Sequence, residues 1–173
     1  MQLFFNPELD PTANTFTFDS NESKHIIRVL RKKNGDKLWI TNGAGYLFEA
    51  TIIDDAIKKC EVEINSSKET HAKSHWLHMA VAPTKMNDRF EWFLEKATEI
   101  GVDEITPIIC DRSERKVLKL ERMKRVLESA MKQSLQTYLP KLNEPISLVE
   151  FLEKPITGLQ FIAHCEETER HEL

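Results

Sequence analysis

The stretch from residue 83 to residue 109 constrains the fold most, because it contains a helix with a legible beginning and end. Apolar side chains recur along it at the three- and four-residue spacing of a single helix face. Asp88 and Glu91 have the spacing of a capping box at its start, and Gly101 is placed to end it in a left-handed turn. The pattern therefore predicts one amphipathic helix that stops at Gly101.

Two apolar segments flank this helix and predict strands. Residues 76–82 and 104–109 read as buried strands, and the order strand, helix, strand is typical of a right-handed β-α-β unit with parallel strands. Further elements are expected after it: a helix over 120–138 stopped by Pro140, a short helix begun by a capping box of Ser147 and Glu150, and a third strand over 159–163. The second half of the chain is thus predicted to be α/β.

The first half of the chain shows short strand patterns. Strands are predicted at 3–5, 16–18, 38–41, 46–53 and 60–64, with one helix that Ser20 caps and Gly35 ends. Short strands at this spacing indicate a small β-barrel. The polar stretch 66–74 lacks periodicity and is interpreted as a linker, so two domains are expected, over residues 1–70 and 74–173.

Composition limits the class of protein. The 173 residues carry a formal net charge of −4, so any attraction to nucleic acid has to come from local patches. Three widely spaced cysteines favour reduced thiols over a disulfide framework or a zinc ribbon. Neither a transmembrane segment nor a secretory signal is recognisable, which leads us to expect a cytoplasmic protein with no membrane partner.

One local patch of positive charge lies in the predicted N-terminal helix and just after it. Its members are Lys24, Arg28, Arg31, Lys32, Lys33 and Lys37. Side chains of this kind on one helix face can contact several RNA phosphates, without sequence preference and with an affinity that falls as salt rises. The alternative, a solvated helix face, stays open on composition alone.

Two other clusters have simpler explanations. Seven basic residues between 112 and 125 alternate with glutamates, which predicts a surface helix held by intrahelical ion pairs. His71, His75 and His78 have a spacing that metal sites can use. The predicted linker and strand would not place these histidines on one face, so no metal is expected.

Two motifs occur in order along the chain: residues 25–31 (HIIRVLR) followed by Gly35-Asp36, and residues 95–107 (EKATEIGVDEITP). Together they resemble the two signatures of the RsmE family of ribosomal RNA methyltransferases. The resemblance spans nearly the whole chain and implies an α/β fold class, with an N-terminal PUA-like β-barrel followed by a SPOUT (α/β-knot) domain. That second domain is expected to be incomplete, because the family's glycine-rich cofactor loop has no counterpart in the sequence.

The resemblance also implies a function. It is S-adenosylmethionine-dependent methylation at N3 of a uridine in 16S ribosomal RNA, with the ribosomal RNA or the assembled small subunit as partner and a homodimer as the working form. Without the knot segment, these 173 residues alone are predicted to be inactive. The alternative is a non-catalytic module that binds RNA or the ribosome.

Particular side chains follow from the resemblance. The RNA-binding set becomes Lys24, His25, Arg28, Arg31, Lys32 and Lys33. The candidate catalytic residues are Arg89 and Arg112, to steer phosphate, and Glu95 and Glu99, for acid–base chemistry or, alternatively, a structural role. The candidate cofactor residues are His164 and Glu166, because open α/β sheets bind ligands beyond the carboxyl ends of their strands. No residue is assigned as the catalytic base.

Overall fold

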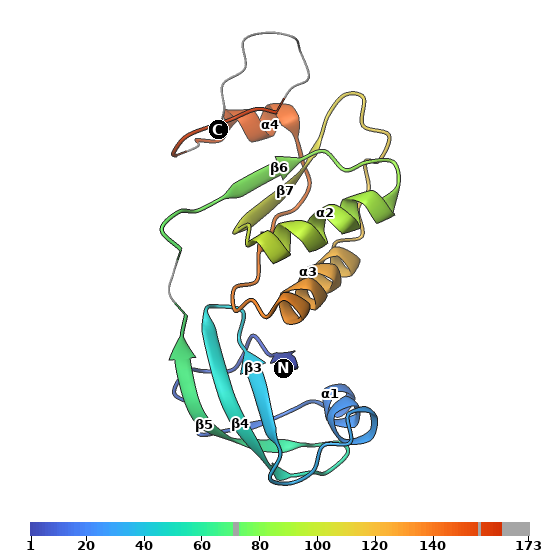
Figure 1. The fold of residues 1–173 in the computed structure, drawn as a ribbon. Coiled ribbons are helices and arrows are strands. Elements are labelled where there is room, and N and C mark those ends of the chain that lie inside the picture. The colour runs from blue at the N-terminus through green and yellow to red at the C-terminus, as the bar shows by residue number, and fades with distance from the viewer. Residues whose placement is uncertain (71–72, 156, 164–173) are drawn as a thin grey trace.

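A computed structural model describes residues 1–70, 73–155 and 157–163 (Figure 1). The first half contains β1 (Leu3–Phe5), β2 (Thr15–Thr17), α1 (Ser20–Lys24), a π-helical turn η1 (His25–Val29), β3 (Lys37–Thr41), β4 (Tyr46–Asp54) and β5 (Glu61–Glu69). The second half contains β6 (His78–Val81), α2 (Asn87–Ile100), β7 (Glu104–Ile109), α3 (Leu120–Ser134), β8 (Lys141–Leu142), β9 (Ile146–Ser147) and α4 (Leu148–Glu153). None of these described helices has the length and apolar character needed to cross a membrane.

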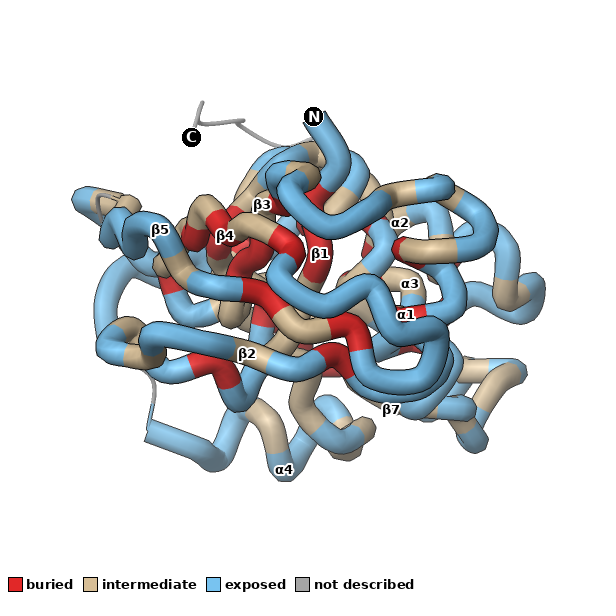
Figure 2. Tube along the Cα trace, turned by 90° about the horizontal axis from the view of Figure 1, so that it is seen from below, coloured by how far each residue is buried: buried red, intermediate tan, exposed pale blue. Residues whose placement is uncertain are grey.

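The first half is a curled five-stranded sheet in the order β1-β3-β4-β5-β2. β4 pairs antiparallel with both β3 and β5, and its inward side chains Phe48, Ala50 and Ile52 are fully buried. They pack with Ile26 of η1 in a single apolar core. Figure 2 shows the buried segments of β1, β3 and β4 gathered in the middle of this sheet. The α/β class and the strand-rich first half predicted from the sequence are confirmed.

Helix α1 is anchored to this core by a buried hydroxyl. Ser23 Oγ donates to the Phe18 carbonyl at 3.1 Å and accepts the Cys60 amide at 2.9 Å, so one side chain joins three segments. Burial raises the pKa of the Cys60 thiol to about 11, which keeps it neutral at physiological pH. Cys60 and Cys110 are both free thiols, as predicted.

The ends of the first helix differ from the prediction. Asp19, not Ser20, is the N-cap, because its carboxylate accepts the Asn21 and Glu22 amides at 2.8 Å each. The helical segment ends at Leu30, well before Gly35. Gly35, with φ +88°, instead shapes the turn that leads into β3.

The second half is built on the predicted β-α-β unit. β6 and β7 are parallel with His78 opposite Glu104, and β8 and β9 add to the other edge of β7. Helices α2 and α3 cover one side of this sheet and α4 lies on the other (Figure 1). Leu94, Ile105 and Leu127 are at most 1% exposed and form the centre of a second core, separate from that of the first half.

Two helix boundaries in this half were predicted wrongly. α2 begins at Asn87 after an extended Met86, so Asp88 lies within the first turn and forms no capping box; its negative charge there is favourable to the helix dipole. Gly101 ends α2 with φ +94°, as predicted. α3 stops at Ser134 rather than 138, because Leu135 adopts a left-handed conformation and the following residues bond to the first half instead.

The predicted strands also need correction. Residues 159–163 form no strand: Leu159 is 88% exposed, and no neighbouring strand in the described part of the chain supplies the hydrogen bonds that an apolar run needs. Residues 66–69, interpreted as linker, extend β5 because the backbone of β4 pairs with them. β6 is half-buried rather than buried, and Trp76 before it is 68% exposed. The capping box of Ser147 and Glu150 is confirmed.

A polar network crosses the parallel sheet at Glu104. Its carboxylate accepts Asn143 Nδ2 at 2.7 Å and Lys141 Nζ at 2.9 Å, while Thr106 Oγ1 bonds both Asn143 and His78 Nε2 at 2.7 Å. Burial alone would raise the pKa of Glu104, but the bonds from Asn143 and Lys141 and the nearby positive charge outweigh it and leave that pKa lowered.

Acid is therefore expected to loosen this sheet. A carboxylate with a lowered folded pKa stabilises the fold above its unfolded pKa of about 4.5, and that stabilisation is lost as the pH falls through the folded value. We expect Glu104→Gln to flatten the pH dependence of the unfolding free energy below about pH 5, measured by urea denaturation. Glu63→Gln, on the exposed side of β5, is the matched control. If the unfolding free energy of both variants depended on pH in the same way, Glu104 would not be the source of the acid sensitivity.

The two halves meet at a hydrogen-bonded joint, formed by residues 43–45, Thr70 and residues 137–139. The Gly45 amide donates to the Thr137 carbonyl, and the Leu139 amide donates to the Gly43 carbonyl, each at 2.9 Å. Thr70 Oγ1 lies 2.6 Å from Thr137 Oγ1, and Tyr138 Oη donates to the Thr70 carbonyl at 3.2 Å. These bonds tie the chain segment after α3 to the turn between β3 and β4.

Candidate functional site

The six residues predicted to bind RNA are brought together on α1, η1 and the turn that follows. We call this set the basic surface: Lys24, His25, Arg28, Arg31, Lys32 and Lys33. All are exposed except Lys32, which is half-buried. The fold produces this arrangement by burying Ser23 and Ile26 beneath the same turns, so that the intervening charged side chains face outward.

The backbone of the basic surface is unusual in two ways. Residues His25–Val29 form a π-helical turn, and Arg31 has φ +55°, one of two positive values at non-glycine residues in the described chain. Such conformations cost free energy and are found most often at functional sites. The left-handed turn at Arg31 redirects the chain so that Lys32 and Lys33 continue the surface beyond the end of η1.

Few carboxylates neutralise this surface. His25 Nδ1 lies 3.8 Å from a carboxylate oxygen of Glu22, and Lys37 forms an ion pair with Glu49 of β4. Lys37 belonged to the first patch read from composition but not to the basic surface, and its charge is paired with this carboxylate. Lys24, Arg28, Arg31 and Lys33 make no ion pair with any described residue, and they remain available to phosphate.

A second region lies at the carboxyl ends of the parallel strands, where ligands of open α/β sheets bind. The loop after β6 and the loop after β7 are tied together there: the Arg115 guanidinium donates twice to the Lys85 carbonyl, at 2.7 and 3.1 Å, and Lys85 Nζ lies 3.2 Å from Glu114. Ser113 Oγ accepts the Cys110 amide at 2.9 Å and fixes the start of the second loop.

The four candidate catalytic residues do not form one cluster. Arg89 lies exposed in the first turn of α2, and Arg112 lies in the loop after β7. Glu95 and Glu99 both accept Lys96 Nζ, at 3.0 and 2.9 Å. These bonds, Glu99 first, raise the pKa of Lys96. The two glutamates thus hold a lysine on the helix surface, which is the structural role weighed for them.

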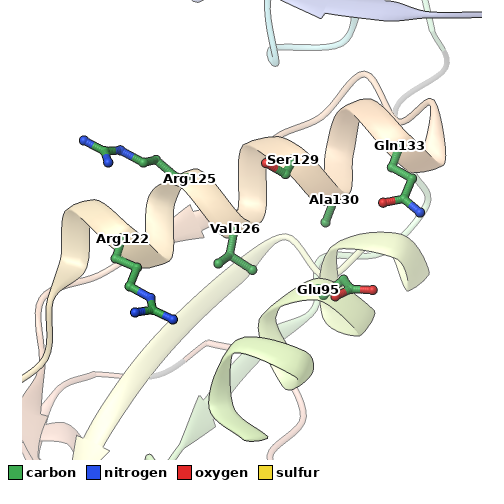
Figure 3. Close-up of a pocket in the computed structure, with 7 residues that line it drawn as sticks. All are labelled: Glu95, Arg122, Arg125, Val126, Ser129, Ala130 and Gln133. Atoms are coloured by element: carbon green, nitrogen blue, oxygen red, sulfur yellow. The ribbon is translucent and has the colours of Figure 1, made fainter. Parts of the chain in front are cut away.

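Glu95 also lines a pocket between α2 and α3 that sequence reasoning missed (Figure 3). The pocket has a volume of about 320 Å³, and its other lining residues are Arg122, Arg125, Val126, Ser129, Ala130 and Gln133. Arg125, Ser129 and Gln133 recur every four residues, a spacing that could have been seen in the sequence. The interleaved glutamates pointed instead to ion pairs, and Glu121 with Lys124 at 2.9 Å confirms one of them.

The histidines contribute no metal cluster in the described part of the chain. His78 bonds Thr106 and packs edge-on against Phe151 of α4, with ring centroids 5.8 Å apart. His164 and Glu166, the candidate cofactor residues, lie outside the described residues, as does His71.

Both halves of the chain match family models of RNA methyltransferases. A family model for an RNA methyltransferase PUA domain matches residues 18–65, and one for an RNA methyltransferase domain matches residues 71–173. The ribosomal RNA small subunit methyltransferase E of Buchnera aphidicola (subsp. Acyrthosiphon pisum) is 29% identical, over 88% of this chain and 62% of that protein. Its namesake in Bacillus subtilis (strain 168) is 27% identical, over 82% and 58%.

Solved structures show the same likeness. A probable rRNA-methyltransferase from Porphyromonas gingivalis is 36% identical, with a TM-score of 0.85 over 96% of this chain and 70% of that one. A putative methyltransferase from Legionella pneumophila, solved with bound SAM, is 25% identical, with a TM-score of 0.83 over 96% and 72%. The chain spans 62%, 49% and 58% of the length of three curated relatives. Because the methyltransferase model covers more than half of its length and the resemblance extends into the N-terminal sheet, the chain belongs to the RNA methyltransferase family.

Proposed function

We propose that this chain is the RNA-holding and scaffold part of an S-adenosylmethionine-dependent methyltransferase that modifies N3 of a uridine in 16S ribosomal RNA. The observation that carries the proposal is the exposed basic surface on α1 and η1. These helical turns pack on the N-terminal sheet, and that sheet is joined to an α/β half that matches a family model of RNA methyltransferases. The relatives named for the ribosomal small subunit support this substrate class. The division into domains over 1–70 and 74–173 is part of the proposal.

In this proposal the basic surface holds the RNA backbone and the α/β half receives the base. Cationic side chains that neutralise phosphates supply affinity and register, without reading the bases. N3 of uracil carries a proton and is a poor nucleophile until that proton leaves, so the base has to be positioned and deprotonated. A uridine within folded RNA has to be exposed or flipped to reach such a site.

Neither of the two pockets along α3 is proposed as the cofactor site. The α2–α3 pocket and a second cavity, lined by Lys124, Leu127 and Pro140 among others, lie along α3 rather than at the carboxyl ends of the strands. The loops at those ends are occupied with their own contacts between Arg115, Lys85 and Glu114. We therefore propose that the knot segment that binds S-adenosylmethionine is supplied by residues other than those described, and we assign no chemical step to the cofactor.

Arg89 and Arg112 are proposed to steer phosphate near the carboxyl ends of the strands. Arg89 follows the first of the paired loops and Arg112 lies in the second, and both are exposed, which suits a contact with RNA rather than proton transfer. Glu95 and Glu99 are less suited to acid–base work, because Lys96 holds both. The proposal also includes a homodimer in the cytoplasm with no metal. Trp92 and Ile100 of α2 are 63% and 79% exposed, with Lys96 between them, and these two apolar side chains are the feature that a second copy would cover.

Removing charge from the basic surface tests its role. Arg28→Ala with Arg31→Ala is expected to weaken binding of small-subunit ribosomal RNA by about tenfold or more and to lower the steepness of its salt dependence by roughly two phosphate contacts. Fluorescence anisotropy at several salt concentrations measures both. Lys58→Ala with Lys59→Ala, in the exposed turn between β4 and β5, is the control of equal charge. An unchanged salt slope for the arginine variant would remove the basic surface from the proposal.

The activity itself is tested with the protein that carries this chain. It is incubated with small ribosomal subunits and methyl-labelled S-adenosylmethionine, and the modified nucleotide is identified by mass spectrometry of the digested RNA. Label at N3 of a uridine supports the proposal. RNA binding without methyl transfer would favour the other candidate, a non-catalytic RNA- or ribosome-binding module, for which the same basic surface is the motivating observation.

A further inference from the structure

We infer that the RNA held on the basic surface continues across α3, where Arg125 contacts one further phosphodiester beside the rim of the α2–α3 pocket. The inference rests on the proposed RNA-binding function and adds a second contact region in the other half of the molecule. Its ligand is a segment of the RNA chain, recognised through the backbone and not through base sequence.

The pocket has the chemistry of a backbone contact. Val126 and Ala130 of α3 form its apolar part, and the polar side chains of Arg125, Ser129 and Gln133 follow on successive turns, with the Arg125 guanidinium and the Gln133 amide on different sides of the helix (Figure 3). Arg125 points away from α2 toward solvent, whereas Glu95 lies on the opposite wall. Backbone oxygens of RNA accept hydrogen bonds from side chains of this kind.

Among the charged residues that line the pocket, Arg125 is the positively charged side chain that remains available to a phosphate. Arg122 is held by Glu91 of α2, with Nε 2.7 Å from Oε1, and this contact raises the pKa of Arg122 further. Glu95 is held by Lys96 at 3.0 Å. Arg125 is exposed and makes no ion pair within the described ranges. A single unpaired guanidinium matches the single negative charge of a phosphodiester.

The position of the pocket suits one continuous RNA path. Figures 1 and 2, which are views at right angles, both place α1 and α3 on the same side of the molecule, with α3 stacked above α1 in Figure 1. α3 packs against β1 of the first half, and the joint at residues 137–139 fixes the segment just after it. A strand of RNA that leaves the basic surface in this direction therefore passes α3 before it reaches the carboxyl ends of β6 and β7.

RNAs of two lengths test the path. We expect Arg125→Ala to weaken an unstructured RNA of about 20 nucleotides by roughly 3- to 10-fold and to lower the salt slope by about 0.7, while an RNA of about 6 nucleotides, which the basic surface alone can hold, binds as before. Arg125→Lys should retain most of the affinity, because the positive charge remains. Lys58→Ala, in the exposed turn between β4 and β5, is the control with the same change in net charge.

The outcomes separate this inference from the proposed function. If Arg28→Ala with Arg31→Ala weakens binding and Arg125→Ala behaves like Lys58→Ala, the path across α3 is wrong and the RNA-binding role of the basic surface is retained. If neither variant weakens binding, the RNA-binding proposal itself fails. In the last experiment, free uridine monophosphate is added to the protein and the NMR signal of Ser129 is followed. Saturable binding of the free nucleotide would make the pocket a small-molecule site and overturn the RNA path.

Discussion

Replacing Gly45 with alanine is expected to disrupt the joint between the two halves and to cost roughly 3 kcal/mol or more of stability. Gly45 has φ +97°, a conformation that already costs an alanine about 1–2 kcal/mol. A Cβ at this position would also overlap the Tyr138 ring, with Cε1 only 2.7 Å away. The ring cannot simply move, because its hydroxyl bonds the Thr70 carbonyl and the Ala44–Tyr138 bridge holds its backbone.

The steric and conformational parts of this effect can be separated. Gly35 has a similar φ of +88°, but a Cβ added there would meet no atom within 4 Å, so Gly35→Ala should show the conformational cost alone. Adding Tyr138→Ala to Gly45→Ala should relieve the overlap and restore part of the loss. Urea denaturation gives the free energies, and peptide-resolved hydrogen exchange should show lost protection around residues 137–139. Equal destabilisation in the Gly45 and Gly35 variants would show that the joint is not tightly packed.

The elements of the fold were largely predictable because each depends on local pattern. The helix that ends at Gly101 and the strand at 104–109 follow from apolar spacing and from a residue that favours a left-handed turn. The capping box of Ser147 was legible for the same reason. The basic surface was also predictable, since charge density along a short helix is visible without knowing what lies opposite.

What the sequence concealed depends on contacts between distant segments. α3 was predicted to run to 138, because nothing local shows that Thr137 and Tyr138 bond to the other half. The ion pair of Lys37 could not be predicted either, because it required knowing that Glu49 lies beside it on β4. The pocket could not be predicted because it forms only where α2 and α3 lie side by side. In each case a tertiary contact overrode a local propensity, which single-sequence reasoning does not see.

Replacing Leu94 with alanine is expected to destabilise the α/β half selectively, by about 2–5 kcal/mol. Leu94 of α2 is fully buried in the core shared with Ile105 and Leu127, and removing most of its side chain leaves a cavity that close-packed neighbours fill only in part. The N-terminal sheet has its own core around Phe48 and Ile26, so its stability should change much less. Unfolding should then show two transitions, the α/β half melting first.

Phe48→Ala is the reciprocal variant, expected to cost about 3–5 kcal/mol in the N-terminal sheet. Binding of short and longer RNAs can be measured for both variants. The Leu94 variant should retain binding of short RNA at the basic surface. It should lose the Arg125-dependent binding of longer RNA, because α3 packs on α2. The Phe48 variant should lose both, since Ile26 anchors η1 in the same core. A single cooperative transition in both variants would contradict this expectation. It would mean that the joint couples the two cores tightly enough for them to unfold as one unit, so that a mutation in either core would weaken RNA binding at the basic surface and at Arg125 alike.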